Sequence, residues 1–344
     1  MAYDKGVLLV NLGTPNSPRI SDVHRYLTEF LTDKRVIDIP WLRRQMLVRG
    51  LIIPSRIKQS AASYAKIWTE QGSPLLTHAL DCQKKLQQSA GEDYVVEVAM
   101  RYQNPSIEKG LEALLAHKLS KLLILPLFPQ YASATTGTVY EKVMQVLRKR
   151  TNVPELLFAG SFPTHPLMID AFASNAEPLD PASYDHILFS FHGLPERQLI
   201  KADESGQRCL RTKECCQKIC STNRNCYSAQ CHATAQAIVN RLRIPKEKYT
   251  IAFQSRLGKE PWLQPSTQEV MLELLRQGKK NLLVFSPSFV CDCLETTFEI
   301  GMEYKQEFLH AGGERLDLVP GLNSTPAWII TLAAICQSYF NITS

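Results

Sequence analysis

Residues 186–195 read His-Ile-Leu-Phe-Ser-Phe-His-Gly-Leu-Pro, an apolar strand that runs into a Gly-x-Pro turn. Residues 7–15, Val-Leu-Leu-Val-Asn-Leu-Gly-Thr-Pro, repeat this pattern near the start of the chain. Apolar runs that are continuous rather than alternating are typical of parallel strands buried on both faces. The two stretches therefore predict a duplicated α/β unit, with ligands at the carboxyl ends of its strands.

The rest of the chain alternates short apolar runs with longer helical patterns, as parallel strands joined by crossover helices do. We expect strands at residues 6–11, 94–100, 121–127, 155–160, 186–191, 249–254, 281–286 and 316–319. We expect helices at residues 21–30, 54–69, 78–89, 106–117, 136–148, 229–242, 267–277, 294–309 and 326–338. The prediction is an α/β protein with two similar, doubly wound parallel sheets of the Rossmann type.

The length of the chain, 344 residues, predicts two domains, because it exceeds what one hydrophobic core usually organises. We expect an N-terminal α/β domain over residues 1–153 and a C-terminal α/β domain over residues 154–324. A helix at 325–340 would pack back onto the first domain. Residues 203–231 would form a cysteine-rich insertion in the second.

Composition and charge narrow the functional classes. Lysine and arginine number 39 and aspartate and glutamate 33, so the formal charge of +6 is mild, and no dense basic block favours nucleic acid. No run approaches the roughly 20 apolar residues of a membrane-spanning helix, and the first residues lack the features of a secretory leader. We therefore expect a cytoplasmic protein that does not cross a membrane.

His192 is the first candidate for chemistry, because it follows an apolar strand and precedes a tight turn. An imidazole accepts and releases protons near neutral pH, so His192 is a candidate base. The alternative is a histidine that is packed and hydrogen-bonded for structural reasons.

An acidic row follows the apolar run at 281–286. Glu295, Glu299 and Glu303 are four residues apart, which places them on one helix face, and Asp292 lies where that helix begins. Such a row at a strand-to-helix junction predicts a metal path or a proton relay. A solvated acidic face is the alternative.

Three further stretches would reach the same crevice, at residues 101–102, 129–137 and 253–262. They combine aromatic side chains with Arg101 and Arg256. Aromatic and apolar walls suit a planar organic ligand, and guanidinium groups suit its carboxylates. The same residue types are also common in ordinary cores.

Together these motifs resemble the ferrochelatase family, metal chelatases of the lyase class that insert ferrous iron into a porphyrin in haem biosynthesis. The resemblance covers nearly the whole chain and is carried, in family order, by residues 11–15, 72–75, 101–102, 129–137, 190–195, 253–256 and 292–303. It implies two similar chelatase-like domains with a cleft between them. It also implies conversion of protoporphyrin IX to protohaem, with coproporphyrin III left open as the substrate.

The resemblance assigns roles residue by residue. His192 and Glu295 would be the essential pair that flanks the macrocycle and contacts the ferrous substrate ion, with Asp292 and Glu299 extending a proton or metal path. The residues that would contact the porphyrin are Leu12, Arg101, Tyr102 and Tyr131. Macrocycle distortion and removal of the pyrrole protons would precede metal insertion.

The segment at 39–58 is apolar and basic and carries no acid between 40 and 54, which is typical of an interfacial amphipathic segment. In the family this stretch forms a lip at the cleft mouth, so the resemblance implies peripheral contact with the inner face of the membrane through residues 41–53. A helix packed on the core is an equal alternative.

Six of the ten cysteines fall between residues 209 and 231, without a Cys-x-x-Cys pair. A reducing compartment disfavours structural disulfides here. Some ferrochelatases hold a [2Fe–2S] cluster, so the resemblance implies one, with candidate ligands Cys209, Cys216, Cys220 and Cys226 and alternates Cys215 and Cys231. Zinc, a disulfide-forming redox loop and an unliganded loop stay open.

Two other functions also stay open. A porphyrin- or metallocofactor-binding protein with a redox-sensing cysteine loop and no turnover would not need both His192 and the carboxylates around Glu295. A chelatase acting on a sirohydrochlorin is disfavoured, because such chains are typically shorter and use histidine-rich metal sites.

Overall fold

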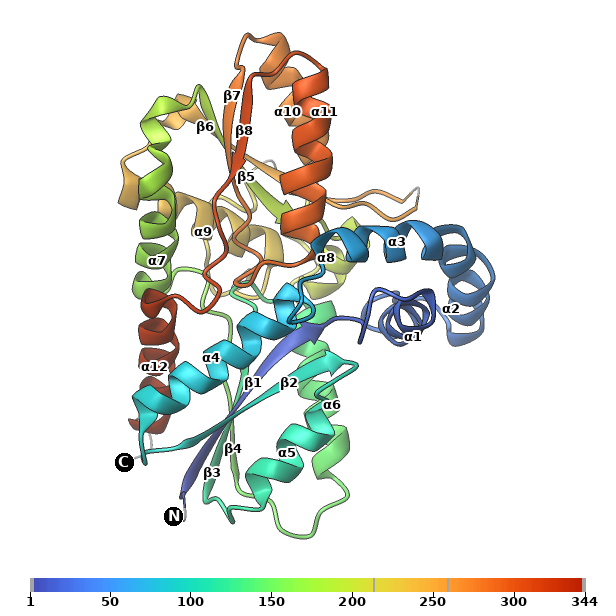
Figure 1. Cartoon of the computed structure of the whole chain (residues 1–344), viewed down its shortest axis with the longest axis vertical. Coiled ribbons are helices and arrows are strands. Elements are labelled where there is room, and N and C mark those ends of the chain that lie inside the picture. Colours follow the sequence, from blue (N-terminus) through green and yellow to red (C-terminus); the bar gives the residue numbers. More distant parts are fainter. Residues whose placement is uncertain (1–2, 213, 259, 342–344) are drawn as a thin grey trace. The chain divides into compact units, whose positions relative to one another are not determined.

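The computed structural model of the chain describes residues 3–212, 214–258 and 260–341, which divide into two compact units (Figure 1). The first unit holds the described residues of Met1–Phe128, Ser133–Gly160 and Asn323–Ser344. The second holds those of Pro129–Ala132 and Ser161–Leu322. The chain therefore returns to its first unit at the carboxyl end.

The first unit is built on a four-stranded parallel sheet in the order β2-β1-β3-β4. Its strands are β1 (Lys5–Gly13), β2 (Val95–Tyr102), β3 (Lys121–Pro126) and β4 (Glu155–Phe158). Its α-helices are α1 (Ile20–Leu31), α2 (Trp41–Leu47), α3 (Ile53–Ile67), α4 (Pro74–Ala90), α5 (Ile107–Leu115), α6 (Thr138–Leu147) and α12 (Pro326–Asn341). Two π-helices, η1 (Val48–Ile52) and η2 (Ser133–Gly137), precede α3 and α6. In Figure 1, α4 and α12 lie on one side of this sheet and α5 and α6 on the other.

The core of the first unit explains why β1 reads as one apolar run. Residues 7–10 are all fully buried, because helices cover both faces of this central strand. Leu8 and Val10 pack with Leu111 of α5 and Val139 of α6 in one apolar cluster. This burial on two faces is what a continuous apolar strand predicts.

The second unit repeats the arrangement with the order β6-β5-β7-β8, all parallel. Its strands are β5 (His186–His192), β6 (Tyr249–Gln254), β7 (Asn281–Phe285) and β8 (Arg315–Leu318). Its α-helices are α7 (Pro166–Ala176), α8 (Glu196–Ala202), α9 (Tyr227–Leu242), α10 (Thr267–Arg276) and α11 (Lys305–His310). Short 3₁₀ turns occur at η3 (Glu177–Leu179), η4 (Pro181–Ser183) and η5 (Lys246–Lys248), and η6 (Leu294–Tyr304) is a π-helix. Both sheets place the first strand of the unit between the second and the third, which confirms the predicted pair of similar parallel-sheet domains.

Two differences from the expected elements bear on function. The helix expected at 294–309 is divided into η6 and α11, so its first part has the wider π-helical turn. The segment at 41–53 is helical as α2 and η1, with Val48 and Ile53 buried. Among the described residues, no helix is both long and apolar enough to span a membrane.

Candidate active site

His192 ends β5, where the backbone turns sharply against β6. The strands pair in register His192↔Gln254, and the Gly193 amide donates to the Gln254 carbonyl oxygen over 2.7 Å. A Cβ atom on Gly193 would lie only 2.9 Å from that oxygen and 3.1 Å from the Ser255 carbonyl oxygen. The close approach of two backbones therefore requires glycine after His192.

The hydrogen bond of the His192 ring defines which nitrogen is available. Nδ1 lies 2.7 Å from the carbonyl oxygen of Gly193. A carbonyl oxygen only accepts, so Nδ1 carries the proton and Nε2 of the neutral ring has a free lone pair. The ring is half-buried and packs edge-on to Phe289, with 6.2 Å between ring centroids. His192 thus presents Nε2 as a base or as a metal ligand.

Gln254 connects this strand end to the acidic helix. Its Nε2 donates to the main-chain carbonyl of Glu295 over 2.8 Å, and its Oε1 accepts from the Ser190 hydroxyl over 2.7 Å. The Gln254 side chain is almost fully buried, so both bonds are shielded from water. The first turn of η6 is therefore fixed to the same sheet edge that carries His192.

The amino-terminal end of η6 is stabilised by local hydrogen bonds. The Cys293 amide donates to the Thr296 hydroxyl over 2.9 Å, and Thr296 and the Gly321 amide both lie within hydrogen-bond distance of Asp292 Oδ1. Asp292 is thereby fixed at the junction where the acidic row begins. Glu295 and Glu299 are half-buried and Glu303 is exposed, so the row leads from the sheet edge toward solvent.

The carboxylate of Glu299 has two hydroxyl donors. Ser255 Oγ donates to one oxygen over 2.6 Å, and Tyr304 Oη donates to the other over 2.9 Å. Burial, together with the nearby Glu299 charge, raises the pKa of Tyr304 far above its ordinary value, so this phenol keeps its proton. Glu299 follows Glu295 by about one turn of η6.

In the first unit, the residues expected to contact the porphyrin are tied to Asp33. Its Oδ2 accepts from Arg101 over 2.6 Å, from the Tyr102 phenol over 2.9 Å and from the Thr138 hydroxyl over 2.6 Å. The Arg101 guanidinium also lies over the Tyr102 ring, 4.4 Å from its centroid. Arg101 is therefore already paired with the Asp33 carboxylate. Tyr102 is fully buried and contacts both side chains of this pair.

Leu12 and Tyr131 are half-buried, which leaves part of each side chain accessible. Leu12 lies near the carboxyl end of β1, and its amide donates to Asn11 Oδ1. The Tyr131 amide donates to Gln230 Oε1 over 2.7 Å, so α9 positions the Tyr131 backbone within the second unit. Leu12 belongs to the first unit and Tyr131 to the second.

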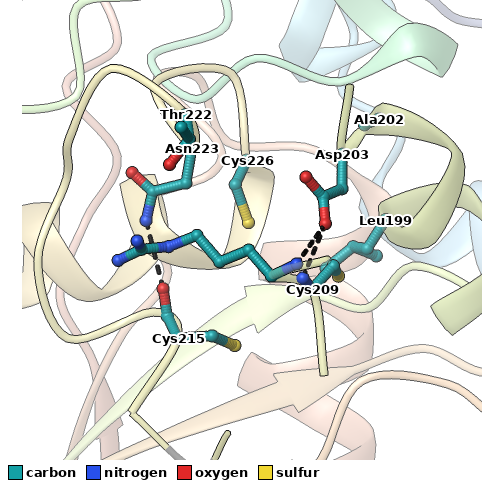
Figure 2. Close-up of a pocket in the computed structure, with 9 residues that line it drawn as sticks. Leu199, Ala202, Asp203, Cys209, Cys215, Thr222, Asn223 and Cys226 are labelled. Carbon is teal, nitrogen blue, oxygen red and sulfur yellow. Dashed lines mark hydrogen bonds between the residues drawn. The ribbon is translucent and has the colours of Figure 1, made fainter. Parts of the chain in front are cut away.

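The cysteine segment folds around a small cavity, shown in Figure 2. Asp203 organises one side, because its Oδ2 accepts from the amides of Arg208 and Cys209 over 2.8 and 2.7 Å. Asn223 organises the other, with its Nδ2 donating to the Cys215 carbonyl over 3.1 Å. The residues that line the cavity are Leu199, Ala202, Asp203, Arg208, Cys209, Cys215, Thr222, Asn223 and Cys226.

The six thiols are not equivalent. Cys209, Cys215 and Cys226 line the cavity, and the Cys216 sulfur lies 3.5 Å from that of Cys215. Cys220 instead lies beside the Thr222 hydroxyl, at 3.1 Å. Cys231 is fully buried in α9, and this burial raises its pKa well above the ordinary value.

The thiols of this segment do not converge on one point in the structure. In the parts of the chain that the structure describes, no group of three or more His, Cys, Asp or Glu side chains is arranged to hold a metal ion. The predicted set of Cys209, Cys216, Cys220 and Cys226 is therefore not converged, and Cys215 is closer to the cavity than Cys220 is.

Several residues in these contacts, in each unit, belong to no recognisable motif. Asp33 lies in the irregular segment between α1 and α2, and nothing in the sequence relates it to Arg101. Tyr304 and Ser288 likewise acquire their contacts only through the fold. Gln254 and Ser255 could be found from the sequence, because they lie at the carboxyl end of the strand predicted at 249–254.

Comparisons with known proteins point to one family. A family model described as ferrochelatase matches residues 4–339. The chain is 44% identical over 337 residues to a ferrochelatase of Pseudomonas fluorescens (strain Pf0-1), which covers 97% of this chain and 98% of that protein. It is also 44% identical over 336 residues to a ferrochelatase of Legionella pneumophila (strain Philadelphia 1), covering 98% and 99%.

A solved structure shows the same fold. The sirohydrochlorin chelatase SirB from Bacillus subtilis subspecies spizizenii, in complex with cobalt, matches with a TM-score of 0.54 and 11% identity. The match covers 98% of this chain and 96% of that chain, and at this identity it bears on the fold alone. Because the family model and both relatives span nearly the whole chain, this protein belongs to the ferrochelatase family.

Proposed function

We propose that this chain inserts Fe²⁺ into protoporphyrin IX to give protohaem, the terminal step of haem biosynthesis, with coproporphyrin III as the alternative substrate. The observation that carries the proposal is the His192 ring. Its Nδ1 proton is held by the Gly193 carbonyl, so Nε2 is available at a sheet edge to which the acidic η6 is also attached. Family membership supports metal insertion into a porphyrin.

The reaction requires proton removal before the metal enters. A flat porphyrin carries two inward N–H groups, so both protons leave and the dianionic ring takes up one Fe²⁺, which conserves charge. Binding that holds the ring in a puckered form lowers the barrier. Nε2 of His192 is the base in this proposal, since it has a lone pair that can accept a proton and an imidazole releases that proton again readily.

The acidic residues supply the second half of the mechanism. Glu295 and Asp292 lie at the start of η6, and Glu299 follows one turn later. Carboxylates accept protons and compensate the charge of a divalent cation. We assign Glu295 to the reacting metal and Asp292 and Glu299 to the path that delivers Fe²⁺ or removes protons.

The proposal is tested by anaerobic incubation with Fe²⁺ and each porphyrin, followed by the product spectrum. We expect His192→Ala to lower turnover about 10²- to 10⁴-fold while metal binding remains. If His192→Ala kept normal insertion rates and Glu295→Gln lost both metal binding and turnover, the base assignment would be wrong. Faster formation of coprohaem than of protohaem would instead assign coproporphyrin III.

The alternative function is a porphyrin binder without turnover. Its expected result in the same assay is porphyrin binding with no change of the product spectrum in the wild-type chain. The ordered contacts of Gln254 and Ser255 with Glu295 and Glu299 favour the enzyme, because binding alone does not require fixed carboxylates.

A [2Fe–2S] cluster on the cysteine segment is a separate proposal. It is supported by Cys209, Cys215 and Cys226 around one cavity, but the thiols would have to converge further to bind a cluster. Iron and acid-labile sulfide in anaerobically purified protein would support it. A colourless protein without sulfide would exclude the cluster and leave zinc, a redox loop or an unliganded loop.

Peripheral membrane contact through residues 41–53 completes the proposal. The exposed apolar side chains of this segment support it, since they offer a surface for a lipid interface. These side chains are Trp41, Leu42, Met46 and Leu51.

A further inference from the structure

Two hydroxyl groups hold the backbone of His192. Ser288 Oγ accepts from the His192 amide over 3.1 Å, and Tyr227 Oη donates to the His192 carbonyl over 2.8 Å. The two hydroxyl oxygens lie 3.2 Å apart. His192, Ser288 and Tyr227 therefore close a ring of three hydrogen bonds around one strand end.

The chemistry of the groups orders the protons in this ring. A carbonyl oxygen only accepts, so the single Tyr227 hydrogen goes to His192. Ser288 must then donate its hydrogen to Tyr227 Oη, while its oxygen accepts from the His192 amide. Each hydroxyl gives and receives one bond, and loss of either leaves a buried backbone group of His192 without its partner.

Tyr227 also connects His192 with the cysteine segment. It is the first residue of α9, and Cys226 directly precedes it as the N-cap. Figure 2 shows the Cys226 sulfur facing the cavity that Cys209 and Cys215 also line. The buried Tyr227 is therefore joined directly to a residue of the cavity wall at one end and hydrogen-bonded to His192 at the other.

The rest of α9 is anchored, so such a shift is local to its first turn. Gln230 Nε2 donates to the Ser161 hydroxyl over 2.9 Å, and the Thr234 hydroxyl donates to the Pro163 carbonyl over 2.7 Å. Both side chains are fully buried. The start of α9 is thus the part of the helix that lies between the cavity and His192.

We propose that Tyr227, with Ser288, is a positioning residue for His192, and that it transmits the state of the cysteine-lined cavity to the site of metal insertion. This inference rests on the proposed role of His192. It assigns a function to Tyr227 that neither the strand motif nor the cysteine spacing indicates. The cavity then acts on turnover through geometry, without contact with the porphyrin.

The first test removes one hydroxyl. We expect Tyr227→Phe to lower kcat roughly tenfold, as loss of one buried hydrogen bond implies, with the KM for porphyrin unchanged. Ser288→Ala is also expected to lower kcat and leave KM unchanged, because it removes the other hydroxyl that holds His192. The matched control is Tyr184→Phe, because Tyr184 is also buried and donates to Asp317 over 2.8 Å.

The outcomes separate this inference from the function on which it rests. If His192→Ala is inactive and Tyr227→Phe has the same kcat as Tyr184→Phe, the positioning role is overturned and the proposed function stands. If His192→Ala retains full turnover, the role of His192 as the base and the positioning role of Tyr227 both fail, while metal insertion by the chain stands. Thermal melting of each variant excludes loss of fold as the cause of a lower kcat.

The second test addresses the cavity by a double-mutant cycle. We expect Cys226→Ala to lower kcat in the wild-type background and to have no further effect on Tyr227→Phe, because both act through one contact. Cys82→Ala, at a buried thiol of the first unit, is the control and should leave kcat unchanged. The coupling would be overturned if the kcat losses of Cys226→Ala and Tyr227→Phe multiplied in the double variant. A normal kcat for Cys226→Ala alone would also overturn it.

Discussion

Gly193 shows how a single residue without a side chain determines the position of its catalytic neighbour. We expect Gly193→Ala to cost about 1–3 kcal/mol of unfolding free energy and to lower turnover, because its Cβ would overlap two carbonyl oxygens of the next strand. The control is Gly50→Ala in η1, where a Cβ meets no atom within 4 Å. Urea unfolding measures both variants, and equal stabilities would contradict the argument.

His186, at the start of β5, predicts a pH dependence of stability. Burial, with Lys279 nearby, lowers the pKa of the His186 imidazole below its ordinary value of 6.5. Between these two pKa values the unfolded chain binds more protons, so the unfolding free energy falls as the pH drops below about 6.5. His186→Gln should flatten this decline in urea titrations at pH 7.5 and 5; an unchanged decline would exclude His186 as a source.

At the scale of elements, the segment formed by α2, η1 and the start of α3 has two unlike sides. Val48 and Ile53 are buried, whereas Trp41 and Leu51 are 66% and 63% exposed. One side of the segment therefore packs on the core, and the other offers apolar surface. Arg44 is buried and donates to the Ile39 carbonyl over 2.8 Å, which secures the start of the segment.

The exposed side of this segment leads to a membrane prediction. We expect the double variant Trp41→Asp with Leu51→Asp to lose co-sedimentation with anionic liposomes, because two charges replace the apolar contact. Leu80→Asp is the matched control, since Leu80 is also exposed, on α4. Co-sedimentation that is unchanged in the double variant would count against a lipid-binding role.

At the scale of the whole molecule, the chain completes its first unit with its last helix. Trp328 of α12 is fully buried, the Cys82 thiol of α4 donates to the Asn323 carbonyl, and the Tyr339 phenol accepts from the Gly160 amide. The first unit therefore depends on residues that are synthesised after the second. This agrees with the two compact units of the chain, in which the described residues after Leu322 belong to the first.

Because the first unit depends on α12, removal of a buried side chain from this helix should lower the free energy of unfolding. We expect Trp328→Ala to lower the unfolding free energy by about 3–5 kcal/mol, because a large cavity would form beneath α12. Ile330→Ala on the same helix should change it by less than about 0.5 kcal/mol, since Ile330 is 59% exposed. Equal effects of the two substitutions in urea unfolding would show that α12 is not packed as described.

Much of the fold was predictable because buried strands and amphipathic helices leave periodic patterns. The run from Val7 to Val10 and its counterpart before His192 both became central strands. The helix α7 was missed, because its apolar residues, such as Leu167 and Ile169 on opposite faces, are spread around it rather than confined to one face. The π-helical form of η6 was also missed, since sequence periodicity does not distinguish it from an α-helix.

The sequence by itself determined the family, the duplicated parallel sheets and the identity of His192 and Glu295 as candidates, because strand ends and local spacing are properties of neighbouring residues. Only the tertiary structure decided which side chains support them. Asp33 meets Arg101, and Tyr227 meets His192, across long stretches of chain, and no local pattern records such contacts. The free nitrogen of His192 was also decided by the fold, since its tautomer follows from the backbone turn at Gly193.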